Sequence, residues 1–136
     1  SYNIFNRTIE KNGLKETARK KQKGIISFSP LAQGMLTNRY LEGIPADSRV
    51  KTDGRFLKED MLSKEKLESI RKLNHMAEER GESLAQMALK WVMKDKDVTS
   101  VLIGVSKPEQ IVDNLKMMEG SLFTEEELIR IDRFSL

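Results

Sequence analysis

Several residue types that often carry function are missing or scarce in this sequence. It contains no cysteine, so it has neither a disulfide framework nor a thiolate to bind a metal. Its one histidine, His75, lies on the polar face of a predicted helix, and alone it forms neither a metal site nor a catalytic dyad. We therefore expect a reduced, cytoplasmic setting and no metal.

Long hydrophobic runs and one-sided charge are absent as well. No apolar stretch is long enough to span a bilayer, and no signal-peptide pattern is present. The 24 basic and 21 acidic residues are interspersed with few aromatics between them, whereas nucleic-acid binders gather their bases on one face. We expect neither a membrane nor a nucleic acid as a partner.

The sequence does contain an alternation of short β-branched runs and helical patterns. Its 136 residues are enough for one domain with a real core. Apolar runs bounded by turn residues predict strands over 2–5, 24–29 and 99–103. A short basic helix is expected over 14–23. The alternation predicts the α/β class.

Capping signals mark the later helices. Ser63 is a predicted N-cap for a helix that ends near Arg80, and Ser83 with Gln86 forms a capping box. Trp91 falls on the apolar stripe of this second helix, which favours core packing. Another capping box begins the last helix, at Thr124 to Glu127.

The segment after the third strand combines a helix start with polar groups. Ser106 and Glu109 form a possible capping box with Pro108 in the first turn, and the apolar face behind them is expected to be buried. Free N–H groups at a helix start attract anions, and Ser106 and Lys107 add a hydroxyl and a cation. A plain helix N-terminus explains the same pattern. The residues of the expected buried face are Ile111, Leu115 and Met118.

The stretch from Gly24 to Arg49 carries the main signal of a binding site. A buried strand ends at Ser29 and Pro30 and continues into a long loop that contains glycines and the bases Arg39 and Arg49. In α/β folds, phosphate sites form at the carboxyl ends of strands. An ordinary solvated loop fits the pattern slightly better. The weakly periodic residues 37–62 predict a lid that closes over an anionic ligand.

Three blocks of the sequence resemble one known family. They read SYNIFNR from Ser1, FSPLAQGMLTNRYLEGIPADSR from Phe28, and IGVSKPEQIVDN from Ile103. In this order they are similar to the aldo-keto reductases, in the branch of the potassium-channel β-subunits and the bacterial glyceraldehyde-phosphate reductases. The resemblance implies the C-terminal part of a (β/α)₈ TIM barrel, with about three parallel strands. A complete barrel needs about 250 residues, so we expect an incomplete barrel and a fragment.

The resemblance also implies how the first two blocks would bind a cofactor. Tyr2 would stack on a nicotinamide ring and Phe28 would lie near it, although core packing explains both residues as well. The loop after Phe28 would hold the pyrophosphate, with two arginines as charge partners. These loop residues are Ser29, Leu31, Gln33, Gly34, Arg39 and Arg49.

By the same resemblance, the third block would bind the adenosine end. Gly104, Ser106 and Lys107 would form the 2′-phosphate site, and the lysine favours NADP over NAD. The helix that follows would contact the adenine and its ribose. Its matching residues are Gln110, Asp113, where relatives often have Glu, and Asn114.

The implied activity is NADPH-dependent reduction of an aldehyde or ketone. The family's catalytic tetrad comes from the first four strands, which this chain lacks, so no catalytic residue is assigned and a carbonyl substrate requires the missing N-terminal half. A non-catalytic nucleotide-binding or partner-docking module and a structural remnant are the alternatives. Open strand edges predict self-association or domain swapping of the chain alone.

Overall fold

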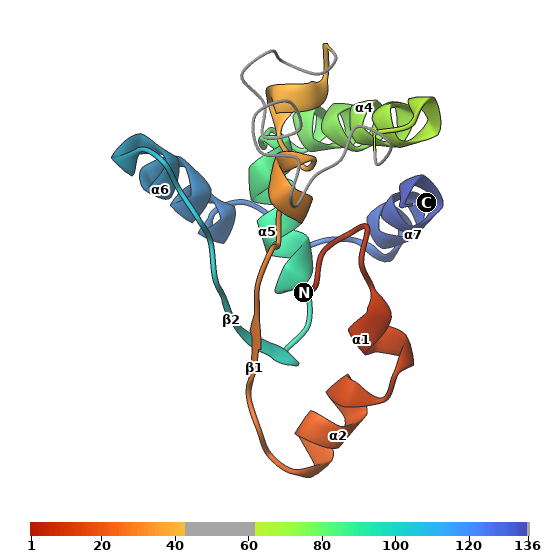
Figure 1. The fold of residues 1–136 in the computed structure, drawn as a ribbon, viewed down its shortest axis with the longest axis vertical. Coiled ribbons are helices and arrows are strands. Elements are labelled where there is room, and N and C mark those ends of the chain that lie inside the picture. The colour runs from red at the N-terminus through yellow and green to blue at the C-terminus, as the bar shows by residue number, and fades with distance from the viewer. Residues whose placement is uncertain (43–61, 136) are drawn as a thin grey trace.

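A computed structural model describes residues 1–42 and 62–135 of the chain. Helices and two short strands follow one another along it (Figure 1). The α-helices and strands are α1 (Thr8–Lys11), α2 (Leu14–Lys20), β1 (Ile25–Ser27), α4 (Lys64–Glu79), α5 (Leu84–Val92), β2 (Val98–Val101), α6 (Pro108–Leu115) and α7 (Glu125–Phe134). The 3₁₀ helices are η1 (Ala32–Gly34), η2 (Asn38–Tyr40) and η4 (Lys116–Met118).

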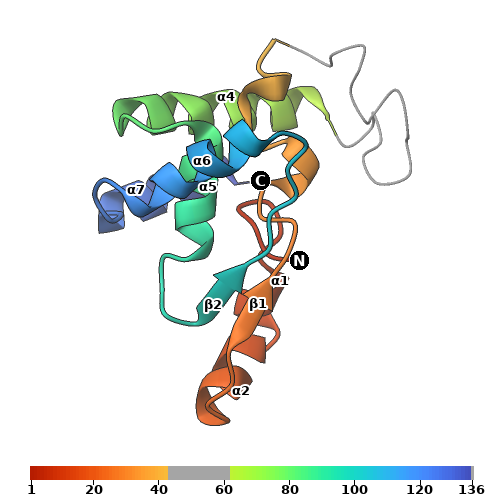
Figure 2. The same ribbon diagram turned by 90° about the vertical axis from the view of Figure 1, so that its left-hand side faces the viewer.

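The two strands lie side by side and run parallel (Figure 2). Ser27 pairs with Val101, and the Leu102 N–H donates to the Ser27 carbonyl over 2.8 Å. Just before β1 the backbone lies close to β2. A Cβ added to Gly24 would lie 2.8 Å from Thr99 Oγ1. The strands predicted over 24–29 and 99–103 are confirmed in their central parts. The result is a partial α/β unit with a parallel sheet rather than a closed barrel.

The strand predicted over residues 2–5 does not form among the described residues. Asn3 and Asn6 instead exchange backbone hydrogen bonds of 3.1 and 3.0 Å, which close a tight turn. The Asn3 side chain stabilises this turn by accepting hydrogen bonds from the N–H groups of Phe5 and Asn6. Asparagine side chains commonly compete with strand ladders in this way, and the short apolar pattern did not reveal it.

Helix α5 lies at the centre of the molecule. Figure 1 shows α4 across one end of it, with α6 and α7 on opposite sides. Trp91, Met87 and Leu84 on α5 are at most 1% exposed, which confirms Trp91 as a core residue. The predicted N-cap at Ser63 and the capping boxes that begin α5 and α7 are all present.

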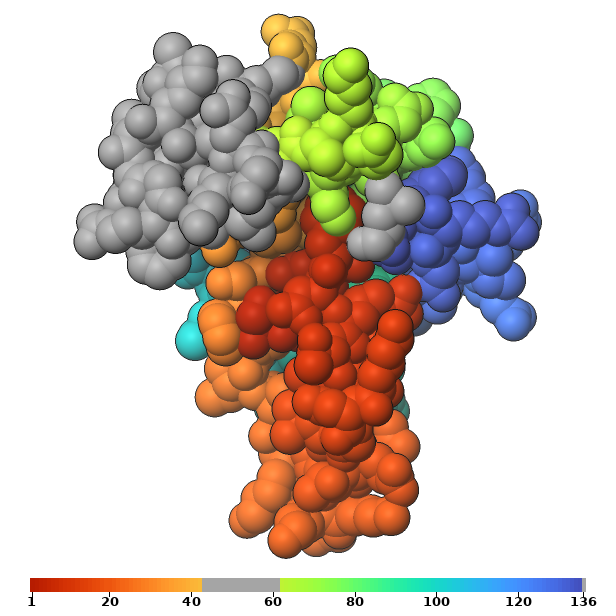
Figure 3. All heavy atoms as spheres, turned by 45° about the vertical axis from the view of Figure 1, so that its right-hand side comes forward, coloured from red at the N-terminus to blue at the C-terminus, as the bar shows by residue number. Residues whose placement is uncertain are grey.

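Helices α1 and α2 protrude from the rest of the molecule (Figure 3). Helix α2 ends at Lys20, three residues before the predicted end. Ion pairs hold it against the chain before β2: Lys15 lies 2.6 Å from Asp95, and Arg19 lies 2.8 Å from Asp97. Lys20 is exposed, as expected for the basic face of a solvated helix.

The predicted buried face of α6 is wrong. Ile111 and Leu115 are 43% and 60% exposed, and Met118 in η4 is 73% exposed. The only buried residue of α6 is Asn114. Helical spacing identifies an apolar face, but it does not supply the partner that covers the face, and none of the described residues does so.

A buried polar cluster joins the first turn to α5. The Tyr2 ring is 1% exposed and lies 5.2 Å from the Trp91 ring in a tilted arrangement. Its hydroxyl donates to Glu10 and accepts from Lys94 Nζ over 2.6 Å. Glu10 also accepts from Arg7 Nε over 2.7 Å and from Lys94 over 3.1 Å.

This cluster shifts the titration of its members. Burial raises the pKa of the Tyr2 hydroxyl, and its bond to Glu10 adds to the effect. Burial alone would raise the pKa of Glu10, but hydrogen bonds from Tyr2 and Arg7 and the charge of Lys94 outweigh it. The pKa of Glu10 is lowered to about 2. Its ionised form therefore contributes to folding stability.

Replacing this carboxylate should change how stability depends on pH. We expect Glu10→Gln to lower the free energy of unfolding at pH 7 by about 2 kcal/mol. Because the folded-state pKa is depressed, wild-type Glu10 contributes fully above pH 4.5 and loses its contribution as the pH falls towards 2. The difference in free energy of unfolding between variant and wild type should become smaller over that range. Urea unfolding at a series of pH values measures it.

Glu16→Gln is the matched control for this measurement. Glu16 forms an exposed ion pair with Lys20 at 2.8 Å on the neighbouring helix. Exposed pairs contribute at most about 1 kcal/mol, so this variant should stay close to wild type. If the free-energy difference between Glu10→Gln and wild type stays constant from pH 7 to pH 2, the stabilising role of ionised Glu10 is contradicted.

Large apolar side chains are exposed on β1, directly after each strand and on α6. We propose that the chain alone self-associates through them, because exposed apolar surface beside open strand edges promotes pairing. Light scattering should then give a mass above that of a monomer, and the double variant Leu102→Ser, Val112→Ser should lower it. Leu122→Ser, at an 84% exposed position before α7, is the control. A monomeric wild type at high concentration would refute the proposal. The exposed residues are Ile26, Phe28, Leu102, Val112 and Leu115.

Candidate functional site: two loops at one edge of the sheet

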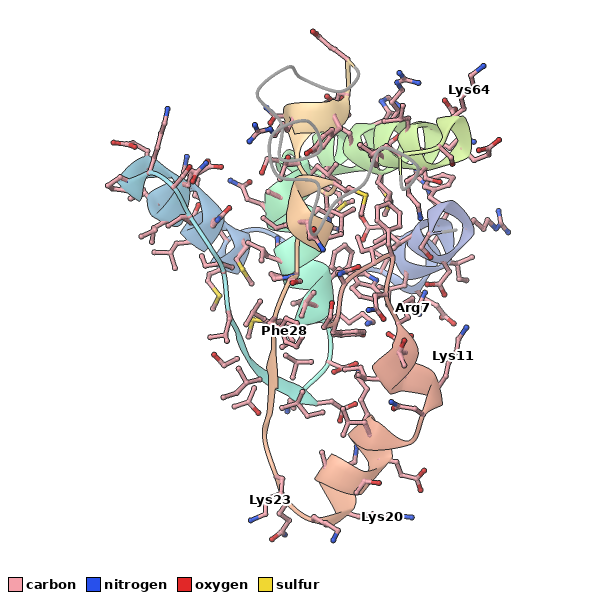
Figure 4. The ribbon with its side chains drawn as sticks, viewed as in Figure 1. Arg7, Lys11, Lys20, Lys23, Phe28 and Lys64 are labelled. Atoms are coloured by element: carbon pink, nitrogen blue, oxygen red, sulfur yellow. The ribbon has the colours of Figure 1, made fainter. Side chains whose placement is uncertain are left out.

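Parallel pairing brings two loops to the same edge of the sheet. Ser27 ends β1 and Val101 ends β2, and these residues pair directly. The segments that follow them therefore leave the sheet at the same edge, and in Figure 1 the segment after β2 then turns away toward α6. Phe28 is 54% exposed just beyond β1, while Lys20 and Lys23 lie at the other end of that strand, beside α2 (Figure 4). The basic residues of α2 are thus remote from this edge.

The loop after β1 has an unusual backbone. Ser29, Ala32 and Gln33 adopt positive φ angles of 53°, 48° and 59°, followed by Gly34 at 95°. Left-handed conformations cost free energy for residues with a Cβ, and they concentrate at functional sites. The backbone folds back through hydrogen bonds from the N–H groups of Gly34 and Leu36 to the Leu31 carbonyl. This loop is therefore held in one shape.

Asn3 anchors this loop to the first turn. Its side chain is buried, and Nδ2 donates to the Ser29 carbonyl over 2.9 Å. The Tyr2 N–H also donates to the Phe28 carbonyl over 3.3 Å. Sequence reasoning missed Asn3, whose only signal was its position directly after Tyr2 in the first block.

The predicted residues of the first loop differ in their accessibility. Leu31 packs partly against the core, and Ser29 and Gln33 are half-buried. The Gln33 side-chain oxygen is buried, and within the described residues it has no hydrogen-bond partner. Arg39 is exposed in η2. The predicted charge partner Arg49 and most of the predicted lid over 37–62 fall outside the described residues.

The second loop contains the exposed residues Gly104, Ser106 and Lys107. The predicted capping box at Ser106 and Glu109 is wrong: Lys107 is the N-cap, and Pro108 is the first residue of α6. The Gln110 side-chain oxygen accepts from the N–H groups of Ser106 and Lys107 over 2.8 and 3.3 Å. Proline at the first helical position moves the cap to the preceding residue.

Part of the backbone at this helix start is already hydrogen-bonded. Gln110 already occupies two backbone N–H groups, and the Ser106 hydroxyl is 3.3 Å from the same oxygen. Lys107 forms no salt bridge with any residue in the described part of the chain. Its ammonium is therefore the group most available to a phosphate.

Of the two remaining residues of α6, Asp113 is exposed and Asn114 is buried. Asp113 accepts hydrogen bonds from Gln86 Nε2 on α5 through its carbonyl over 2.9 Å and its carboxylate over 3.1 Å. Asn114 is 8% exposed. Tyr2 is buried among Glu10, Lys94 and Trp91, so its ring does not face solvent. The structure thus brings the strand ends together and assigns Tyr2 to the core.

An open hollow of about 530 Å³ lies elsewhere, against α1 and α2. None of the predicted site residues lines it, and four of its five cations, Arg7, Lys15, Arg19 and Lys94, are paired with acids. In residues 1–42 and 62–135 there is no cluster of acids and histidine that could hold a metal. No helix in these residues is long and apolar enough to cross a membrane.

Comparison with known proteins identifies relatives of this chain. An L-glyceraldehyde 3-phosphate reductase of Escherichia coli O157:H7 is 48% identical over 136 residues, which cover 98% of this chain and 39% of that protein. A putative voltage-gated potassium channel subunit beta of Schizosaccharomyces pombe is 38% identical over 113 residues, 80% of this chain and 33% of that protein. The chain spans about two fifths of the length of the reductases it matches.

Solved structures share the fold. The glycerol dehydrogenase of Gluconobacter oxydans superposes with a TM-score of 0.76 at 29% identity, over 98% of this chain and 40% of that one. Residues 1–135 match the model of the Aldo/keto reductase family. The match runs through both strands, both loops and all the helices described above. The chain therefore belongs to the aldo/keto reductase family.

Proposed function

We propose that this chain is the cofactor-binding part of an NADPH-dependent aldo-keto reductase. The observation that carries the proposal is the shared edge of β1 and β2, where the Ser27 and Val101 ends meet. In this proposal a dinucleotide lies across both loops, with its pyrophosphate on the first and its adenosine end on the second. Family membership makes such a cofactor the expected ligand.

The residues present fit this cofactor. The first loop offers a left-handed backbone and the buried oxygen of Gln33, which has no hydrogen-bond partner in the described part of the chain. Such an oxygen accepts a hydrogen bond, as from the carboxamide or a sugar hydroxyl of a dinucleotide. The second loop offers the Ser106 hydroxyl and the Lys107 ammonium to a 2′-phosphate. NADP carries this phosphate and NAD does not, so Lys107 would select between the two.

The bound cofactor would supply a hydride to an aldehyde or ketone. In this proposal the chain's own residues bind and orient the nucleotide, and Phe28 covers part of it at the end of β1. Residues outside this chain would supply the proton, so none of Tyr2, Tyr40 or His75 is assigned that role. The expected cytoplasmic setting belongs to the same proposal.

A second candidate is a non-catalytic module that binds nucleotide or docks a partner. The 38% identity with a potassium channel subunit beta favours it. NADPH oxidation driven by a carbonyl compound separates the two candidates. We expect no turnover by the chain alone and turnover once the family's N-terminal half is joined to it. Nucleotide binding without any turnover in the joined protein would favour the module.

Lys107→Ala tests the 2′-phosphate site. We expect its affinity for NADP to fall about tenfold, because one charge-assisted hydrogen bond to the phosphate is lost. NAD lacks the phosphate, so its affinity should change less than about twofold. Titration calorimetry with both nucleotides measures the difference.

Lys72→Ala, which removes an exposed lysine on α4, is the control and should change neither affinity. Equal losses for NADP and NAD in Lys107→Ala would remove Lys107 from the 2′-phosphate site. A wild-type chain with no affinity for either nucleotide would favour a structural remnant.

A further inference from the structure

Gln86 on α5 is 8% exposed, and both the oxygen and the nitrogen of its side-chain amide form hydrogen bonds. Its oxygen accepts from the Ser83 N–H over 3.0 Å as part of the capping box. Only the nitrogen can then donate, and it donates to Asp113 twice, at the carbonyl over 2.9 Å and at the carboxylate over 3.1 Å. The capping box thus fixes which way the amide points.

Helix α6 has few other attachments to the described part of the chain. Its apolar residues Ile111, Val112 and Leu115 are 43%, 65% and 60% exposed, and only Asn114 is buried. The two bonds from Gln86 are therefore the main polar link between α6 and the core. Lys107 caps the same helix about 9 Å along its axis from Asp113, so a rotation or shift at Asp113 carries directly to Lys107.

We propose that Gln86 is a positioning residue for nucleotide selectivity, acting through Asp113 to place Ser106 and Lys107 at the 2′-phosphate of NADP. The inference rests on the proposed function, because it needs that phosphate at the start of α6. Gln86 itself does not touch the nucleotide. Its role is to fix the orientation of a short helix whose first residues do.

The variant Gln86→Glu tests this role without removing the cap. Glutamate at this position still accepts from the Ser83 N–H, as in the common capping box. It cannot donate to Asp113, and its carboxylate repels the Asp113 carboxylate. We expect affinity for NADP to fall about tenfold and affinity for NAD less than about threefold in titration calorimetry of the full chain.

Two further variants separate positioning from stability. Ser83→Ala removes the other half of the same capping box, where the Ser83 hydroxyl accepts from the Gln86 N–H over 3.2 Å, and leaves the bonds to Asp113. It should weaken folding while keeping the ratio of NADP to NAD affinity. Adding Asp113→Asn to Gln86→Glu supplies an amide donor opposite the new carboxylate, and it should restore part of the ratio.

Hydrogen exchange of the free protein gives a second readout that needs no nucleotide. Gln86→Glu should speed exchange of the α6 amides, while Ser83→Ala should act mainly on the first turn of α5. Unchanged hydrogen exchange in α6 of Gln86→Glu would overturn this inference alone. So would a wild type that binds NADP together with a Gln86→Glu variant that keeps the same ratio of NADP to NAD affinity. A wild type that does not bind NADP overturns the proposed function and the inference with it.

Discussion

The parallel pairing of β1 with β2 is the constraint on which the candidate site depends. The hydrogen bond from the Leu102 N–H to the Ser27 carbonyl continues the ladder one residue beyond Val101. The segments after β1 and β2 must then leave the sheet at the same edge, whatever their later path. One leaves into the left-handed turn at Ser29, and the other into the segment that begins α6. A shift in register would move the start of one loop along the sheet relative to the start of the other.

Local signals in the sequence predicted much of the architecture. The capping residues Ser63, Ser83 and Thr124 each begin a helix, because a side-chain oxygen at that position satisfies an N–H group that the helix leaves free. Trp91 lies in the core because it falls on the apolar stripe of α5, a helix that is buried along most of its length. The family was recognised from three blocks, and a match over residues 1–135 confirms it.

Features set by distant contacts could not be predicted in the same way. Asn3 turns the first segment instead of extending it, and its partner at Ser29 is 26 residues away. Gln86 was predicted as a capping residue, but its bonds to Asp113 connect two helices that no local pattern relates. The sequence pattern correctly predicted an apolar face on α6, but the prediction that this face is buried was wrong. None of the described residues packs over it. The roles of the cofactor-binding positions remain predictions.

The central claim is that one dinucleotide contacts both loops at the shared edge. Backbone amide spectra recorded by NMR during a titration with NADP test this claim most directly. We expect signals of residues 29–34 and of residues 106–110 to move together, with one common dissociation constant. Movement of only one of these groups, or of residues in the hollow beside α1 and α2 instead, would contradict it.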